Sequence, residues 1–270
     1  MRVHSLHIYP VKSARGIALE TAQVKPRGLA GDRRFMLVDR DGGFITQREF
    51  PKLAQLCTRQ IDEGIALSWP GQNWLKIPTP SPSRQLVTVW KSTVDATNIQ
   101  GEINAALSDW LGRAVSLVFM DKTAERLASP KWTTAPSPVS FADGYPVLIT
   151  NTASLTALNN YITNTGGAAL GMDRFRPNIG IDCDTPWAEN TWKSLQIGGV
   201  ILDLVKPCAR CIMTSIDQKT GAKNPKTALT ALKHLNPSTA PNNPGVLFGW
   251  NAVPRVGGKI AMGATVIIPK

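Results

Sequence analysis

The feature that most constrains the fold is the way glycine and proline divide the chain. The 270-residue sequence contains 22 glycines and 20 prolines, which fall between short apolar segments and are not gathered in one linker. Such punctuation is typical of a β-rich fold, in which turns alternate with strands of a few residues. The sequence therefore predicts a mainly β protein with a few helices, a β-rich α+β fold.

The apolar segments between these turns give the positions of the strands. The clearest hairpin signal is Asp41-Gly42, between the apolar residues 35–38 and 44–46, because an Asp-Gly pair tolerates the positive φ of a tight turn. The other predicted strands cover residues 65–69, 86–90, 115–119, 147–150, 179–182, 195–197, 200–206, 212–216, 247–250 and 260–268.

Helical spacing of apolar residues predicts three helices. Residues 102–111 and 153–162 each carry an apolar stripe, with Gly112 as a C-cap of the first and Thr152 as an N-cap of the second. A third, weaker pattern covers residues 227–234. Two proline-rich loops interrupt the chain, and the first of them, at residues 130–138, is the best candidate for a domain boundary.

Composition limits the class of protein and its partners. The hydrophobic content of 43% is enough for one large core or two modest ones. The first residues lack the apolar stretch of a signal peptide, and no run approaches the ~20 residues that span a bilayer, so we predict a soluble, cytoplasmic protein with no membrane partner. The net charge of +11 is scattered, which favours an anionic cofactor or substrate but predicts no nucleic-acid partner.

A pair of thiols carries the strongest chemical signal. Cys208 and Cys211 lie two residues apart, beside Lys206 and Arg210, between segments predicted to be strands. Nearby cations favour the thiolate, which is the form of cysteine that binds metals and acts as a nucleophile. We therefore expect this segment to bind an electron-poor centre.

Other uses of a thiol pair remain as alternatives. A structural zinc site closes with four ligands, but there is no second CxxC and the three histidines lack the usual spacing. Thioredoxin-like exchange expects the CxxC to open a helix after a strand, whereas strands are predicted on both sides here. Two thiols that pack as small core residues are the simplest alternative. The other two cysteines, Cys57 and Cys183, lie far from the pair in sequence, and the three histidines are His4, His7 and His234.

Cations and polar groups recur where other predicted strands begin or end. Each of these groups also has an ordinary structural explanation. An isolated lysine such as Lys12 is usually a solvated turn residue, and arginines at the start of a strand usually form salt bridges at the surface. Asp143 fits common turn chemistry. Together with a cysteine, however, five cations near strand ends predict one anionic pocket with a soft ligand, since arginine suits phosphate and carboxylate. The residues concerned are Lys12, Ser13, Arg33, Arg34, Asp143, Tyr145, Arg174, Arg176 and Asn178.

Six segments in a fixed order give a resemblance that covers nearly the whole chain. They are YPVKS, GLAGDRRFMLVD, FADGYPVLIT, RFRPNIGID, KPCARCIMTSIDQKTG and LFGWN. The chain resembles MOSC-domain proteins that carry an N-terminal MOSC β-barrel domain, whose relatives include the mitochondrial amidoxime-reducing components and bacterial molybdoenzymes that detoxify N-hydroxylated bases. The resemblance implies a MOSC N-terminal β-barrel domain at residues 1–120 and a MOSC β-barrel domain at residues 121–270.

The resemblance also implies a pyranopterin molybdenum cofactor. It assigns the metal ligand to Cys211, with Cys208 as a neighbour. It also places Asp143 close to the metal, and we therefore take Asp143 as the candidate for proton handling. Either Arg33 or Arg34 matches the arginine after the glycine loop, and alignment on Phe35 favours Arg34. The family label includes pyridoxal phosphate binding as well. By similarity, the pterin and its phosphate would be held by Lys12, Ser13, Arg34, Tyr145, Arg176, Asn178, Ala209, Arg210 and, through its backbone, Asn251.

The function implied by the resemblance is molybdenum-dependent reduction of N-hydroxylated compounds: hydroxylamines, amidoximes and N-hydroxylated bases. Some bacterial relatives carry a ferredoxin domain, but the sequence contains no C-x4-C-x2-C spacing, so we expect electrons from a separate ferredoxin, flavodoxin or reductase-type partner. One alternative is a carrier of the cofactor or of sulfur that uses the same cysteine. Another is a basic β-barrel that binds single-stranded nucleic acid.

Overall fold

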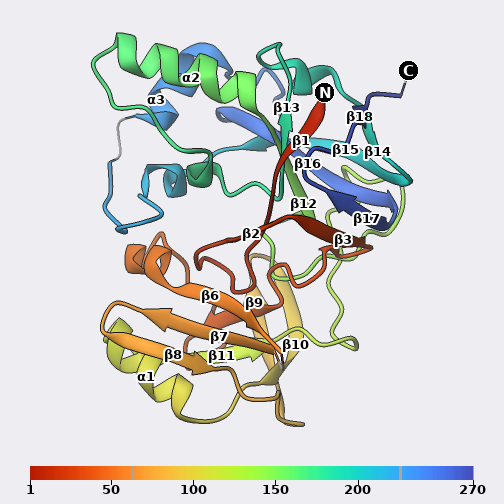
Figure 1. Cartoon of the computed structure of the whole chain (residues 1–270). Helices are drawn as coiled ribbons and strands as arrows, with labels where there is room; N and C mark the ends of the chain where they lie inside the picture. The colour runs from red at the N-terminus through yellow and green to blue at the C-terminus, as the bar shows by residue number, and fades with distance from the viewer. Residues whose placement is uncertain (63, 225–226, 270) are drawn as a thin grey trace.

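The computed structural model describes residues 1–62, 64–224 and 227–269 of the chain. Its largest element is an eight-stranded sheet in the upper half of Figure 1. In spatial order its strands are β18 (Val266–Ile267), β14 (Ser194–Ile197), β15 (Val200–Ala209), β16 (Leu247–Val256), β12 (Val147–Asn151), β13 (Ile179–Asp182), β1 (Arg2–Ile8) and β2 (Ile17–Leu19).

Three smaller sheets complete the β structure, and two of them lie in the lower half of Figure 1. One has the order β5 (Phe35–Val38), β11 (Ser116–Phe119), β10 (Ser92–Asn98) and β9 (Arg84–Val89). The others are β6 (Cys57–Ile61), β7 (Gly64–Trp69) and β8 (Gln72–Lys76), and then β17 (Gly258–Ala261), β3 (Thr21–Lys25) and β4 (Gly28–Leu29).

Helices are short and few among the described residues. The helix α1 lies in the lower half of the molecule, whereas α2 and α3 lie together above the large sheet (Figure 1). The three α-helices are α1 (Glu102–Leu111), α2 (Thr152–Asn164) and α3 (Ala228–Leu235), and the 3-10 helices are η1 (Pro51–Gln55), η2 (Met172–Phe175), η3 (Ala188–Thr191) and η4 (Ile212–Ser215). The predicted mainly β fold with a few helices is confirmed. No described helix has the length and apolar character needed to cross a membrane.

The first strands of the chain belong to the same sheets as its last ones. β1 pairs with β13, and β3 pairs with β17, so the N-terminal segment crosses into the upper half before the chain enters the lower sheets (Figure 1). Alternating side chains of β1, among them Val3, Leu6 and Ile8, are buried in the core of the large sheet. The predicted division of the chain at residue 120 stays a prediction.

We call the part of the molecule around the large sheet the upper half, and the part with α1 and the sheets of β5–β11 the lower half. Each half has its own apolar core. In the upper half, Ile149, Ile179 and Leu202 belong to the core of the large sheet. In the lower half, Ile103 and Leu107 of α1 pack in a separate core with residues of β7 and β11. The space between the two cores is where polar side chains of both halves meet.

Most predicted elements are confirmed, with local corrections. Gly112 is the left-handed C-cap of α1, as predicted. The N-cap of α2 is Asn151 and not Thr152, because the Asn151 side chain accepts a hydrogen bond from the Ala153 N–H over 2.9 Å. The predicted strand at residues 260–268 is two short strands, β17 and β18, separated by a turn in which Gly263 has a φ of 74°.

Two predicted strands are wrong because local hydrogen bonds replace strand pairing. Residues 44–46 form no strand: Phe44 makes an isolated bridge to Val38, and the Ile45 N–H donates to the Leu37 carbonyl. The turn before them is wide, and in it the Asp39 carboxylate accepts from the N–H groups of Asp41 and Gly43. Residues 212–215 form the 3-10 helix η4, in which both the N–H and the hydroxyl of Thr214 donate to the Cys211 carbonyl.

Irregular pairing of β15 with β16 shapes the region next to the thiol pair. The register shifts between Leu204 and Lys206 and again between Pro207 and Ala209. Opposite, Gly249 has a φ of 74°, and a Cβ there would lie 2.5 Å from the Ile149 carbonyl oxygen. Bulges of this kind re-aim side chains, and here they lie just before the thiol pair while Ala209 still pairs with Leu247.

Candidate functional site

A cavity of about 120 Å³ opens where the two halves meet. Every predicted site residue except Arg34 lines it. The lining residues are Lys12, Ser13, Arg33, Thr46, Ala142, Asp143, Gly144, Tyr145, Leu148, Arg174, Phe175, Arg176, Asn178, Cys208, Ala209, Arg210, Cys211, Met213 and Asn251.

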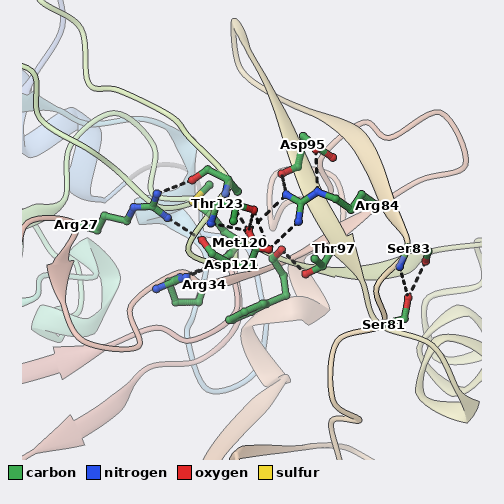
Figure 2. A network of polar contacts seen from close by, with 12 residues as sticks. Arg27, Arg34, Ser81, Ser83, Arg84, Asp95, Thr97, Met120, Asp121 and Thr123 are labelled. Atoms are coloured by element: carbon green, nitrogen blue, oxygen red, sulfur yellow. Dashed lines mark hydrogen bonds and ion pairs between the residues drawn. The ribbon is translucent and has the colours of Figure 1, made fainter.

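The two adjacent arginines point to different places, which corrects the preference for Arg34. Arg34 donates from Nε to the Met120 carbonyl oxygen over 2.8 Å, and Figure 2 shows it beside Arg27 in a network separate from the cavity lining. Arg33 lines the cavity and adopts a φ of 47°. The left-handed conformation of Arg33 directs the side chains of Arg33 and Arg34 to different regions. Alignment on Phe35 compares sequence positions only, so it does not reveal this difference.

Strained backbone is concentrated at this cavity. Ser13, Arg33 and Arg176 have φ values of 66°, 47° and 55°, although none is glycine. Such conformations cost about 1–3 kcal/mol each and cluster at functional sites. The residues with strained backbone therefore lie at the same cavity as the cationic side chains and the thiol pair.

The thiol pair lies at one wall of the cavity. Cys208 is half-buried near the end of the strand β15, whereas Cys211 is exposed just before η4. Arg210 donates to the Cys208 sulfur over 3.0 Å, but the cation that contacts the Cys211 sulfur, at 3.3 Å, is Arg48 of the lower half. The exposure of Cys211 contradicts the alternative of two thiols packed in a core.

Lys206, the other cation beside the pair in sequence, is directed elsewhere. Its Nζ lies 5.5 Å from the centre of the Trp132 ring. The prediction that sequence neighbours supply the charge is therefore correct for Arg210 at Cys208 and wrong for Lys206. Within residues 1–62, 64–224 and 227–269, no three His, Cys, Asp or Glu side chains form a group that could hold a metal ion.

Asp143 is held by one buried cation, Lys12. The Nζ of Lys12 lies 2.5 Å from the Asp143 carboxylate and donates to the Phe141 carbonyl over 2.9 Å. Desolvation acts to raise the pKa of Asp143, but the charge of Lys12, with Arg48 and Arg33, holds that pKa below its ordinary value. Asp143 is thus a carboxylate near neutral pH, with its side chain 60% exposed.

The loop that carries Asp143 is fixed from behind by Arg126. This arginine is buried and donates to the backbone carbonyls of Ser140, Ala142 and Asp143 at 2.7, 2.5 and 2.8 Å. At the other side of the loop, Gly28 has a φ of 95°, and a Cβ there would lie 2.3 Å from the Pro146 carbonyl oxygen. The loop is therefore positioned by residues of both halves.

Arg33 joins the halves through a buried network. Its guanidinium binds the Asp32 carboxylate at 2.7 Å and the Asn178 side-chain oxygen at 3.1 Å. Asn178 also accepts from the Leu148 N–H and donates to the His7 carbonyl. Desolvation opposes the charge of Arg33, but the pKa of Arg33 is raised above its ordinary value by Asp32. Both polar atoms of the Asn178 side chain are thus hydrogen-bonded within the protein, so Asn178 holds Arg33 and the cavity wall in position.

Arg176 contributes a buried cation from the upper half. Burial lowers its pKa to about 10, which leaves it charged at neutral pH. Its guanidinium donates to the Gln218 side-chain oxygen over 3.0 Å, and Gln218 in turn exchanges hydrogen bonds of 3.1 and 3.0 Å with Gln47 of the lower half. The position of Arg176 therefore depends on contact between the halves.

Two buried polar atoms of cavity residues have no hydrogen-bond partner within the described part of the chain. They are the hydroxyl of Tyr145 and the Nε of Arg210. Burial raises the pKa of Tyr145 to about 12, so its hydroxyl is a neutral donor. By contrast, Asn251 donates to the Lys206 carbonyl over 3.2 Å. Unpartnered buried donors are costly unless a ligand satisfies them, so they favour an acceptor-rich ligand.

The sequence analysis missed Arg48, Arg126 and Trp90. Trp90 donates from Nε1 to the Asp143 carboxylate over 3.3 Å, and the Arg48 guanidinium lies 4.7 Å from the centre of the Trp90 ring. None of the three lies in a motif. Trp90 was predicted as the last residue of a strand, but the structure places it in the hairpin turn with a φ of 57°, a conformation that favours glycine.

Comparisons with known proteins agree with this architecture. The family model described as the MOSC N-terminal beta barrel domain matches residues 1–114, and the MOSC domain model matches residues 136–267. The mitochondrial amidoxime reducing component 2 of Bos taurus is 30% identical over 246 residues, which cover 86% of this chain and 71% of the relative. This chain belongs to the MOSC-domain family. In this MOSC protein, the cavity is lined by residues from both matched regions.

Other relatives of this MOSC protein carry two different names. The mitochondrial amidoxime-reducing component 1 of Homo sapiens is 30% identical over 250 residues, with 86% of this chain and 71% of the relative covered. The molybdenum cofactor sulfurase of Drosophila mojavensis is 28% identical over 240 residues, with 85% of this chain but 30% of the relative covered.

Proposed function

We propose that this protein is a molybdenum-cofactor-dependent reductase of N-hydroxylated compounds, with Cys211 as the protein ligand of the metal. The relatives named amidoxime-reducing components support the reaction class. The single observation that carries the proposal is the exposed Cys211 sulfur at the wall of a cavity lined by cations. A thiolate suits a soft metal, and cations suit a phosphate.

The donor set fits a pterin cofactor that carries a phosphate. Lys12, Arg33, Arg174, Arg176 and Arg210 all line the cavity, against one lining carboxylate, Asp143. The unpartnered Tyr145 hydroxyl and Arg210 Nε supply hydrogen-bond donors that the protein itself does not use. The arginines hold the anionic end of the cofactor, and the strained turns at Ser13, Arg33 and Arg176 keep these donors in place before binding.

The chemistry that the bound cofactor supplies is two-electron reduction of the N–O bond; overall, the N-hydroxyl compound, two electrons and two protons give the amine and water. The protein contributes binding, orientation and proton movement. We assign proton movement toward the leaving oxygen to Asp143, because its side chain is 60% exposed at the cavity and pairs with Lys12. Electrons come from a separate redox protein, which the positive net charge of +11 helps to attract if that partner is acidic. A cytoplasmic location stays a prediction.

A second function is favoured by the thiol pair and by the similarity to a molybdenum cofactor sulfurase. Cys208 lies in the same wall as Cys211, and two nearby thiols suit the transfer of sulfur or of a bound cofactor to another protein. A carrier of this kind would use the same cavity and cysteine without reducing an N-hydroxyl compound.

The decisive experiment compares Cys211→Ala with Cys208→Ala after expression in a host that makes the molybdenum cofactor. We expect wild-type protein to hold stoichiometric molybdenum and to reduce an amidoxime with an artificial electron donor. Cys211→Ala should lower turnover more than about 100-fold, as expected when a metal ligand is removed, whereas Cys208→Ala should keep most of it.

The outcomes separate the two functions. Full turnover by Cys211→Ala would contradict the role of this cysteine. Molybdenum-loaded wild-type protein that reduces no amidoxime or hydroxylamine, but transfers sulfur or cofactor to an acceptor protein, would replace the reductase with the carrier.

A further inference from the structure

Trp90 occupies a position for which its side chain is poorly suited. It follows β9 directly, and Trp90 and Lys91 form the two-residue turn that joins β9 to β10, with Val89 opposite Ser92. The φ of Trp90 is 57°, and tight hairpin turns favour glycine at a residue with positive φ. A bulky residue there is strained, which suggests a use beyond the hairpin itself.

The contacts of Trp90 lead to the reacting end of the cavity. Its indole N–H donates to the Asp143 carboxylate over 3.3 Å. Its ring is covered by the Arg48 guanidinium at 4.7 Å, and the same guanidinium lies 3.3 Å from the Cys211 sulfur. The ring of Phe44 packs beside it, with centroids 5.1 Å apart. Trp90 therefore contacts Asp143, the residue assigned to proton transfer, and is linked through Arg48 to Cys211, the residue assigned to metal binding.

The ring remains available in spite of these contacts. Trp90 is 43% exposed, so its packing against Phe44 and Arg48 leaves part of the indole open to solvent. Neither Trp90 nor Arg48 is among the residues that line the cavity, but each contacts one that is. Together they form an aromatic and cationic rim, contributed by the lower half, above a site whose Cys211 comes from the upper half.

We propose that Trp90, supported by Arg48 and Phe44, is a stacking platform that makes the site selective for planar aromatic N-hydroxylated compounds. The inference rests on the proposed reductase function. A flat π-system stacks on an exposed indole, and its N-hydroxyl group then extends past Asp143 toward the cavity. An alkyl hydroxylamine has no such surface, so it gains nothing from the platform.

Trp74 provides a matched control. It is 41% exposed and carries the Arg59 guanidinium 4.3 Å from its ring centre, but it belongs to β8 and does not contact a cavity residue in any described interaction. The test set is therefore wild type, Trp90→Leu, Trp90→Phe and Trp74→Leu. Phenylalanine keeps a ring but removes the N–H bond to Asp143, which separates stacking from hydrogen bonding.

The experiment measures equilibrium binding by calorimetry of a phenyl-substituted amidoxime and its methyl-substituted counterpart, with molybdenum-loaded protein. We expect Trp90→Leu to weaken binding of the phenyl compound about tenfold and to change binding of the methyl compound less than about twofold. Trp90→Phe should recover most of the phenyl affinity, and Trp74→Leu should match wild type.

Equal affinity of wild type for both compounds, or equal losses for both in Trp90→Leu, would overturn the platform. So would a Trp90→Phe protein that behaves like Trp90→Leu, since the N–H bond would then be responsible. Turnover of both compounds is measured separately. Selective binding without turnover would refute the reductase and leave the platform standing, whereas turnover without selective binding would do the reverse.

Discussion

The two walls of the cavity are built in different ways. In the upper wall, functional residues come from compact motifs, and several are fixed within their own half; Arg210, for example, donates to the Phe175 carbonyl over 2.8 Å. In the lower wall they come from scattered turns, and their side chains reach across. Lys12 binds Phe141 and Asp143, and Arg33 binds Asn178.

The comparison teaches that the site is complete only when the halves are in contact. Arg15 also donates across the boundary, to the carbonyls of Gln218 and Lys219. Contacts that cross the boundary should therefore affect cofactor retention and stability more than contacts within one half. Four predictions test this difference, in order of decreasing effect.

The largest effect is expected from Arg33→Met. It leaves the buried Asp32 carboxylate without its cation, and breaking a buried pair costs about 3–5 kcal/mol of unfolding free energy. The molybdenum content should fall with it. Arg34→Met is the control within one half and should cost only about 1.5–3 kcal/mol, since it loses hydrogen bonds to the Met120 carbonyl but leaves no carboxylate buried without its cation. Denaturant unfolding measures the stability of the two variants, and metal analysis measures their molybdenum content. Equal losses in Arg33→Met and Arg34→Met would show that contacts across the boundary matter no more than contacts within one half.

Lys12→Met tests the ion pair across the boundary. Because Lys12 holds the pKa of Asp143 low, the variant should raise that pKa, which carbon-13 NMR of the carboxyl group measures. In wild type the ionised Asp143 contributes stability above about pH 4, and this contribution is lost as the pH falls further. Unfolding between pH 3 and pH 7 should therefore depend less on pH in the variant. Lys206→Met is the control, and an unchanged Asp143 pKa in Lys12→Met would contradict the assignment.

A smaller effect is expected at the pair of glutamines. Gln47 and Gln218 exchange two hydrogen bonds across the boundary while both are buried. A double-mutant cycle with Gln47→Leu and Gln218→Leu should give a coupling free energy of about 1–2 kcal/mol. Additive single effects would show that the two side chains stabilise the contact independently.

The smallest effect is expected from Asn251→Ala. In the part of the chain that the structure describes, its side chain donates to the Lys206 carbonyl within the upper half, so the variant should lose about 0.5–1 kcal/mol of stability. Amidoxime turnover should stay within about twofold of wild type. A loss of molybdenum comparable to that of Arg33→Met would show that Asn251 has a direct role at the cofactor.

Local sequence was sufficient for elements whose determinants are local. Apolar spacing predicted α1, and Gly112 takes the left-handed conformation that a C-cap favours. It failed at residues 212–215, where Thr214 donates to the Cys211 carbonyl and turns the chain into η4. An apolar run of five residues does not reveal such a competing bond.

The candidate site divides in the same way. The residue types and motif order of the sequence determined the chemistry that is available: a thiol pair, several cations, a carboxylate and a family resemblance. The tertiary structure decided which of these groups meet. It turned Arg33 and not Arg34 into the cavity through a backbone with positive φ, and it brought Arg48 to Cys211 from 163 residues away. The reason is physical, because residue identity fixes charge and hydrogen-bonding capacity, whereas contact between distant residues depends on how the two cores pack together.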